Sequence, residues 1–118
     1  MRSIAVSAMA ILALMSSALA HAFLERASPP VGSESAVAPP ELSITFTEGV
    51  EAAFSTIEVR DAAGSGVPIG KPHLASDNKR TLVVELPKIG AGTYTVIWHA
   101  TSVDTHKTEG TYRFSIRP

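Results

Sequence analysis

Apolar and polar residues alternate in several short segments of the chain, and a period of two is typical of β-strands with one buried face. Six segments carry this alternation or a short apolar run: residues 22–28, 41–47, 55–61, 81–87, 92–102 and 110–118. In four of them it predicts which side chains face the core: Leu42, Ile44 and Phe46; Ile57 and Val59; Tyr94, Val96 and Trp98; Tyr112, Phe114 and Ile116. We therefore expect strands throughout the chain after residue 21.

Turn-forming clusters separate these segments and indicate how they are connected. They are rich in Gly, Pro, Ser, Asn and Asp and lie at residues 28–35, 38–41, 61–68, 76–80 and 88–93. No segment after residue 20 has a helical period, and no internal repeat is present. Short strands separated by such turn-forming clusters predict an all-β domain, a small immunoglobulin-like Greek-key β-barrel or sandwich of about seven strands.

The first 20 residues differ from the rest and resemble a secretory signal peptide. Arg2 is followed by an uncharged apolar run over residues 4–14, and small residues stand at Ala18 and Ala20. This order is typical of a cleavable signal, whereas a membrane anchor would carry more Leu and Ile than Ala and Ser. Cleavage after Ala20 leaves His21 first, and the alternative cut leaves Phe23 first. We expect a signal peptide over residues 1–20 and one exported β-domain over residues 21–118.

Cleavage changes the chemistry that the chain can offer. Its three methionines, Met1, Met9 and Met15, and one of its ten basic residues, Arg2, are all removed. The remaining chain has a net charge of about −2 and no basic patch, which argues against a nucleic-acid partner. The sequence contains no Cys, so neither a disulfide nor a thiolate site can form.

Two features could bind a metal ion. Asp104 and His106 are two residues apart, so on an extended backbone both side chains would project to the same side. Alone, this D-x-H pair is a weak signal. At a mature N-terminus, His21 would offer its amine and its imidazole Nδ1 to one ion. With His106 and Asp104 this gives a nitrogen- and oxygen-rich set, which favours Cu(II) by geometry and affinity.

The combination resembles the CopC family of periplasmic copper-binding proteins. The residues that carry the resemblance are an A-x-A sequence before His21, SPPVGS at 28–33, FTE at 46–48, GTYTVIW at 92–98, SVDTH at 102–106 and GTYRF at 110–114. The resemblance covers residues 21–118. It implies a small Greek-key β-barrel in the periplasm that takes part in copper resistance or uptake.

The same resemblance assigns candidate site residues. The family's Cu(II) site would comprise His21, through its amine and imidazole, together with Asp104 and His106. Glu48 would be a weak ligand or a hydrogen-bond partner of the ligands. A monomer is expected, with an inner-membrane copper transporter of the CopD kind as a partner.

The chain departs from some family members in its sulfur content. Those members bind Cu(I) in a Met-rich loop, but residues 21–118 contain neither Met nor Cys, the soft ligands that Cu(I) prefers. We therefore expect a Cu(II)-only protein. His73 lies where that loop would be and is expected to be a solvated loop residue. His99 is expected to be a structural group on a strand face.

Two other functions remain open from the sequence. An N-terminal histidine that chelates copper is also found in copper polysaccharide oxygenases, but this chain is short and lacks an aromatic platform for a polymer. A metal-free immunoglobulin-like module that binds proteins through its edge strands is the other alternative. No G-x-S-x-G motif and no Cys nucleophile are present, and we expect a carrier rather than an enzyme.

Overall fold

The computed structural model describes residues 22–118. The expected signal peptide, residues 1–20, and His21 lie outside the described residues. Across the part of the chain that is described, strands dominate, and the helical content is a single 3-10 turn, η1 (Ala52–Phe54). No helix among these residues has the length and apolar character needed to cross a membrane.

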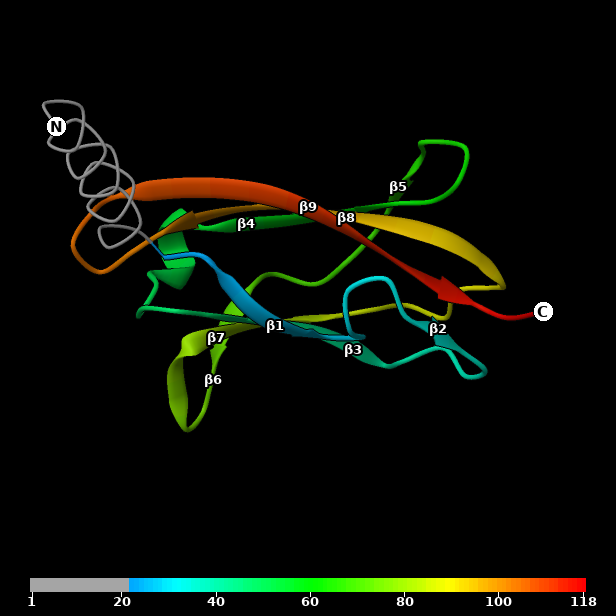
Figure 1. The fold of residues 1–118 in the computed structure, drawn as a ribbon, viewed down its shortest axis with the longest axis horizontal. Coiled ribbons are helices and arrows are strands. Elements are labelled where there is room, and N and C mark those ends of the chain that lie inside the picture. The colour runs from blue at the N-terminus through cyan, green and yellow to red at the C-terminus, as the bar shows by residue number, and fades with distance from the viewer. Residues whose placement is uncertain (1–21) are drawn as a thin grey trace, which may run out of the picture.

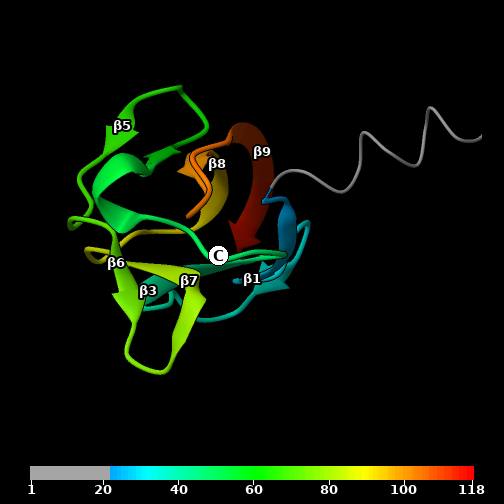
Figure 2. The same ribbon diagram turned by 90° about the vertical axis from the view of Figure 1, so that its left-hand side faces the viewer.

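The strands form two sheets that face each other (Figure 1). One sheet has the order β1 (Leu24–Ser28), β3 (Glu41–Phe46), β7 (Asn78–Glu85) and β6 (His73–Ala75). The other has the order β2 (Glu34–Ser35), β9 (Lys107–Ile116), β8 (Gly92–Thr101), β4 (Thr56–Arg60) and β5 (Gly66–Val67). Neighbouring strands are antiparallel except β2 and β9, which are parallel. Figure 2 shows the two layers from one end.

The expected all-β sandwich is confirmed, and each of the six segments with a strand pattern overlaps a strand, although β7 and β9 begin three residues before the predicted segments. Three further strands, β2, β5 and β6, were not predicted. Each has only two or three residues, too few to show a period, and β2 and β5 lie inside turn clusters. They form because a longer strand lies beside them and supplies hydrogen-bond partners.

The core lies between the sheets and is built from the side chains that the alternation assigned to it. Phe46 of one sheet meets Trp98 of the other edge to face, with ring centroids 5.1 Å apart. Tyr94 stacks on Phe114 at 5.5 Å within the second sheet. Aromatic pairs in these arrangements add about 0.5–1.5 kcal/mol each to the stabilisation from burial alone. These contacts hold the sandwich together without a disulfide.

The alternation fails at one position of β3. Thr45 points away from Leu42, Ile44 and Phe46 and was expected on the polar face, yet it is only 5% exposed. Its Oγ1 lies 2.8 Å from Oγ1 of Thr81 on β7, and the two residues are cross-strand partners. The hydrogen bond satisfies both hydroxyls and so permits their burial.

Gly110 of β9 allows the Trp98 ring to pack directly against the strand. A Cβ at this position would be 2.6 Å from Cζ2 of Trp98, and that ring is only 4% exposed. We expect Gly110→Ala to lower the free energy of unfolding by roughly 1–3 kcal/mol, the usual range for overpacking. Urea unfolding monitored by Trp98 fluorescence measures this change in the free energy of unfolding. Gly66→Ala is the matched control, since nothing lies within 4 Å of its Cβ position; equal losses in both variants would contradict the steric argument.

Candidate metal centre

The D-x-H pair lies in a tight loop, residues 102–106, between the end of β8 and the start of β9. The Ser102 N–H donates to the His106 carbonyl at 2.9 Å, and the Thr105 N–H donates to the Ser102 carbonyl at 2.9 Å. Thr105 has a φ of 74°, in the left-handed region that non-glycine residues rarely adopt. The loop is therefore a closed turn and not the extended segment assumed from the spacing.

Asp104 and His106 nevertheless come together. His106 Nδ1 lies 3.3 Å from Asp104 Oδ2, and both side chains are about half exposed, 50% and 51%. The side chains meet because the turn folds back on itself, whereas the spacing argument relied on a straight strand. The result is an imidazole and a carboxylate at the surface of one end of the sandwich, within reach of an ion from solvent.

Ser102 organises this loop and was missed as a separate site residue, although it belongs to the SVDTH motif. It is fully buried, its hydroxyl donates to Asp104 Oδ1, and the His106 N–H donates to its Oγ at 3.2 Å. The Ser102 hydroxyl is the largest cause that holds the pKa of Asp104 below its ordinary value of 3.8. Its effect and the smaller one of His106 outweigh the desolvation of the carboxylate.

The first described residues are fixed at the same end of the molecule. Ala22 is fully buried, and its carbonyl accepts a hydrogen bond from Thr108 Oγ1 at 2.6 Å. Phe23 exchanges two hydrogen bonds with Thr47: its N–H donates to Thr47 Oγ1 at 3.0 Å, and its carbonyl accepts from the Thr47 N–H at 2.8 Å. Thr108 lies two residues beyond His106, so the start of the domain reaches the end that carries the D-x-H pair.

Glu48 belongs to a third segment at this end. Its neighbour Gly49 accepts a hydrogen bond from the Val103 N–H at 3.0 Å, and Val50 forms a β-bridge with Ser102. Glu48 is half-buried beside these contacts. Over residues 22–118, however, no group of three or more His, Cys, Asp or Glu side chains is close enough to hold a metal. Of these side-chain types, the described residues thus bring together only the Asp104–His106 pair at this loop.

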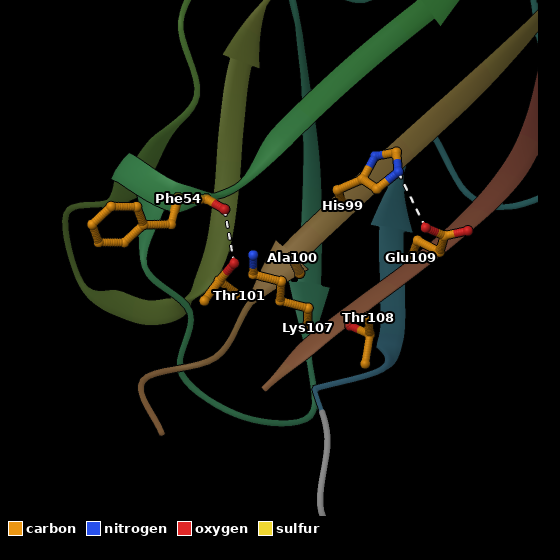
Figure 3. A pocket seen from close by; sticks show the side chains of 7 residues that line it. All are labelled: Phe54, His99, Ala100, Thr101, Lys107, Thr108 and Glu109. Atoms are coloured by element: carbon orange, nitrogen blue, oxygen red, sulfur yellow. Dashed lines mark hydrogen bonds and ion pairs between the residues drawn. The ribbon is translucent and has the colours of Figure 1, made fainter. Parts of the chain in front are cut away.

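The other two described histidines lie apart from the pair. His99 projects from the outer face of β8, with Nε2 3.2 Å from Glu109 Oε1 on β9, and lines a pocket of about 440 Å³ (Figure 3). Phe54, whose carbonyl accepts from Thr101 Oγ1 at 2.8 Å, forms another wall. Neither Asp104 nor His106 lines this pocket. His73 is exposed at the start of β6.

Comparison with known proteins places the chain in a family. The model of the CopC domain matches residues 24–117, which is nearly all of the described chain. The chain belongs to the CopC family. YobA of Escherichia coli K12 is 34% identical over 99 residues, which are 83% of this chain and 80% of YobA. The copper transport protein CutJ of Bacillus subtilis is 35% identical over 104 residues, which are 87% of this chain but only 19% of CutJ.

Solved structures agree with the family assignment. CopC from Methylosinus trichosporium OB3b is similar with a TM-score of 0.78 and 33% identity, covering 83% of this chain and 95% of that protein. PcoC, a methionine-rich copper resistance protein from Escherichia coli, is similar with a TM-score of 0.74 and 28% identity, covering 83% of this chain and all of PcoC. The two-sheet arrangement that carries the 102–106 loop is thus that of CopC proteins.

The lowered pKa of Asp104 predicts how this carboxyl affects stability. A carboxyl whose pKa is lower in the folded than in the unfolded protein stabilises the fold above its ordinary pKa and loses this contribution as the pH falls through the folded-state value. We expect the free energy of unfolding of Asp104→Asn to fall less than that of the parent as the pH is lowered below about 4. Urea unfolding of both metal-free proteins across this range measures it. Parallel pH curves would show that the Ser102 and His106 contacts do not stabilise the carboxylate.

Proposed function

We propose that the exported chain begins at His21 and holds one Cu(II) ion through the His21 amine and imidazole, Asp104 and His106. The observation that carries this proposal is the hydrogen bond from Thr108 Oγ1 to the Ala22 carbonyl. Because consecutive Cα atoms are about 3.8 Å apart, anchoring Ala22 restricts where an N-terminal His21 can reach. Asp104 and His106 lie at the same end of the sandwich.

The donor set matches the chemistry of copper. The described pair supplies one imidazole and one carboxylate, and an N-terminal histidine adds two nitrogens. Three nitrogens and one oxygen in a tetragonal arrangement favour Cu(II), which also has the highest affinity among the first-row divalent metals. Glu48 has a supporting role in this proposal, as a hydrogen-bond partner or weak ligand from the neighbouring loop. Relatives named for copper resistance and copper transport support the assignment of the ion.

The absence of sulfur ligands supports Cu(II) rather than Cu(I) as the bound ion. PcoC is described as methionine-rich, whereas this chain has no Cys and no Met after Met15. Cu(I) prefers thiolate and thioether ligands, and Cu(II) prefers imidazole, amine and carboxylate. We infer a protein that binds Cu(II) only and does not pass copper between sites for two oxidation states.

The protein acts in this proposal as a monomeric periplasmic carrier of copper and not as an enzyme. Ligands that are half exposed allow the ion to be taken up and handed on. A membrane copper transporter of the CopD kind is the proposed recipient. In CutJ, named as a copper transport protein, the part that matches this chain is about a fifth of a longer protein. Linking such a domain to its recipient raises the effective concentration of the cargo.

The proposal predicts a sharp difference between two histidines. In protein that begins at His21, His106→Ala should weaken Cu(II) binding by roughly 100-fold or more, since loss of even an outer-shell partner of a metal typically costs 10–100-fold. His73→Ala should leave binding unchanged, because this exposed side chain lies on β6. Competition titration with a chromogenic Cu(II) chelator measures both. Equal affinities for the two variants would rule out His106 as a ligand.

The role of the N-terminal amine can be tested without changing any side chain. One Ala added before His21 moves the amine out of the chelate, so Cu(II) affinity should fall about as much as on loss of the His21 imidazole. One Ala added after Pro118 is the matched control and should have no effect. Electron paramagnetic resonance should show loss of one nitrogen ligand in the first variant alone. If both extended proteins bound Cu(II) like the parent, the amine would not be a ligand.

A further inference from the structure

Ser102 is the buried residue from which both members of the metal-binding pair are held. Its side chain is fully buried, yet its hydroxyl donates to Asp104 Oδ1, and Asp104 is about half exposed. The same Oγ accepts a hydrogen bond from the His106 N–H at 3.2 Å. One hydroxyl thus contacts the side chain of Asp104 and the main chain of His106.

Each carboxylate oxygen of Asp104 has a different neighbour. Oδ1 accepts from Ser102, and Oδ2 faces His106 Nδ1 at 3.3 Å. Without a donor at Oδ1, the carboxylate could rotate about its side-chain bonds, since an exposed Asp has broad rotational freedom at χ2. The Ser102 hydroxyl therefore fixes the orientation of the Asp104 carboxylate beside the imidazole.

Ser102 is itself held firmly by the fold. It lies one residue after β8, and its N–H donates to the His106 carbonyl at 2.9 Å. It also pairs with Val50 in a β-bridge that joins the loop to the segment after β3. Main-chain contacts with His106 and Val50 thus fix the position of the Ser102 hydroxyl. The hydroxyl in turn restricts the movement of the exposed Asp104–His106 pair.

We propose that Ser102 is a positioning residue for copper binding, which directs Asp104 Oδ2 and His106 toward a common ion. This inference rests on the proposed function, because it assumes that Asp104 and His106 bind Cu(II). Ser102 does not contact the ion. It orders the carboxylate before the ion arrives, so less conformational entropy is lost on binding.

The test is made in protein that begins at His21 and compares Ser102 with Ser55, a buried serine between η1 and β4 that contacts Thr101 at the end of β8. Ser102→Ala should weaken Cu(II) binding by roughly 10–100-fold, the usual effect of losing an outer-shell partner. Ser55→Ala is the matched control: Ser55 is 5% exposed, donates to the Glu51 carbonyl at 2.8 Å and accepts from the Thr101 N–H at 3.1 Å, without touching the D-x-H pair. This variant should bind Cu(II) like the parent.

Two readouts separate positioning from general destabilisation. The electron paramagnetic resonance spectrum of Cu(II) in Ser102→Ala should contain a second species, because a carboxylate that Ser102 no longer holds turns away from the ion in part of the molecules. The loss of affinity caused by Ser102→Ala should also shrink in an Asp104→Ala background, since residues that act through one another are not additive. An unchanged spectrum together with the same loss in both backgrounds would overturn the inference.

The outcomes distinguish this inference from the proposed function. If the parent does not bind Cu(II), the proposed function fails. If the parent binds and the two serine variants bind equally well, only the role of Ser102 fails. Should Ser102→Ala not fold, nuclear magnetic resonance of the parent provides the test. The Ser102 hydroxyl proton should exchange slowly and lie close to the Asp104 carboxylate, and a freely exchanging hydroxyl would overturn the inference.

Discussion

The register of the β8–β9 hairpin is the constraint on which the rest of the site depends. Ten successive residue pairs join the strands, from Gly92 opposite Ile116 to Thr101 opposite Lys107. A slip of one residue would turn every inward side chain of one strand to solvent. Gly110 also opposes Trp98, whose ring leaves no room for a Cβ there. The register fixes where pairing stops, and the 102–106 loop occupies that point.

Three segments that are distant in the sequence meet at the end of the sandwich that carries the D-x-H pair. The start of the domain, the loop after β3 and the loop after β8 are joined by hydrogen bonds between Thr108 and Ala22, between Thr47 and Phe23, and between Val103 and Gly49. The conformational entropy lost when these segments come together is therefore lost during folding, before any ion binds. An ion that binds only the folded form would in turn stabilise it by mass action.

The exposure of the loop supports the proposed role as a carrier. Asp104 and His106 are half exposed, and they lie outside the pocket on the β8–β9 face. The buried Ser102 orders both residues from the side of the core. Their other side faces solvent and stays accessible to an ion. In the proposed function, a rigid base under an exposed imidazole and carboxylate permits both selective binding and release of the ion.

The sequence by itself determined the β-sandwich and most of its core. The alternation that buries Leu42, Ile44 and Phe46 is local, so it can be read without knowing what the strand pairs with. The motifs also indicated the family and the residues that could bind copper. Three features were decided only by the tertiary structure, because they depend on strand pairing and burial. They are the short strands β2, β5 and β6, the burial of Thr45 against Thr81, and the position of Ser102 beneath the D-x-H pair. These depend on contacts between residues far apart in the chain, or on a turn at Thr105 that departs from extended backbone. No periodicity along the sequence records either kind of contact.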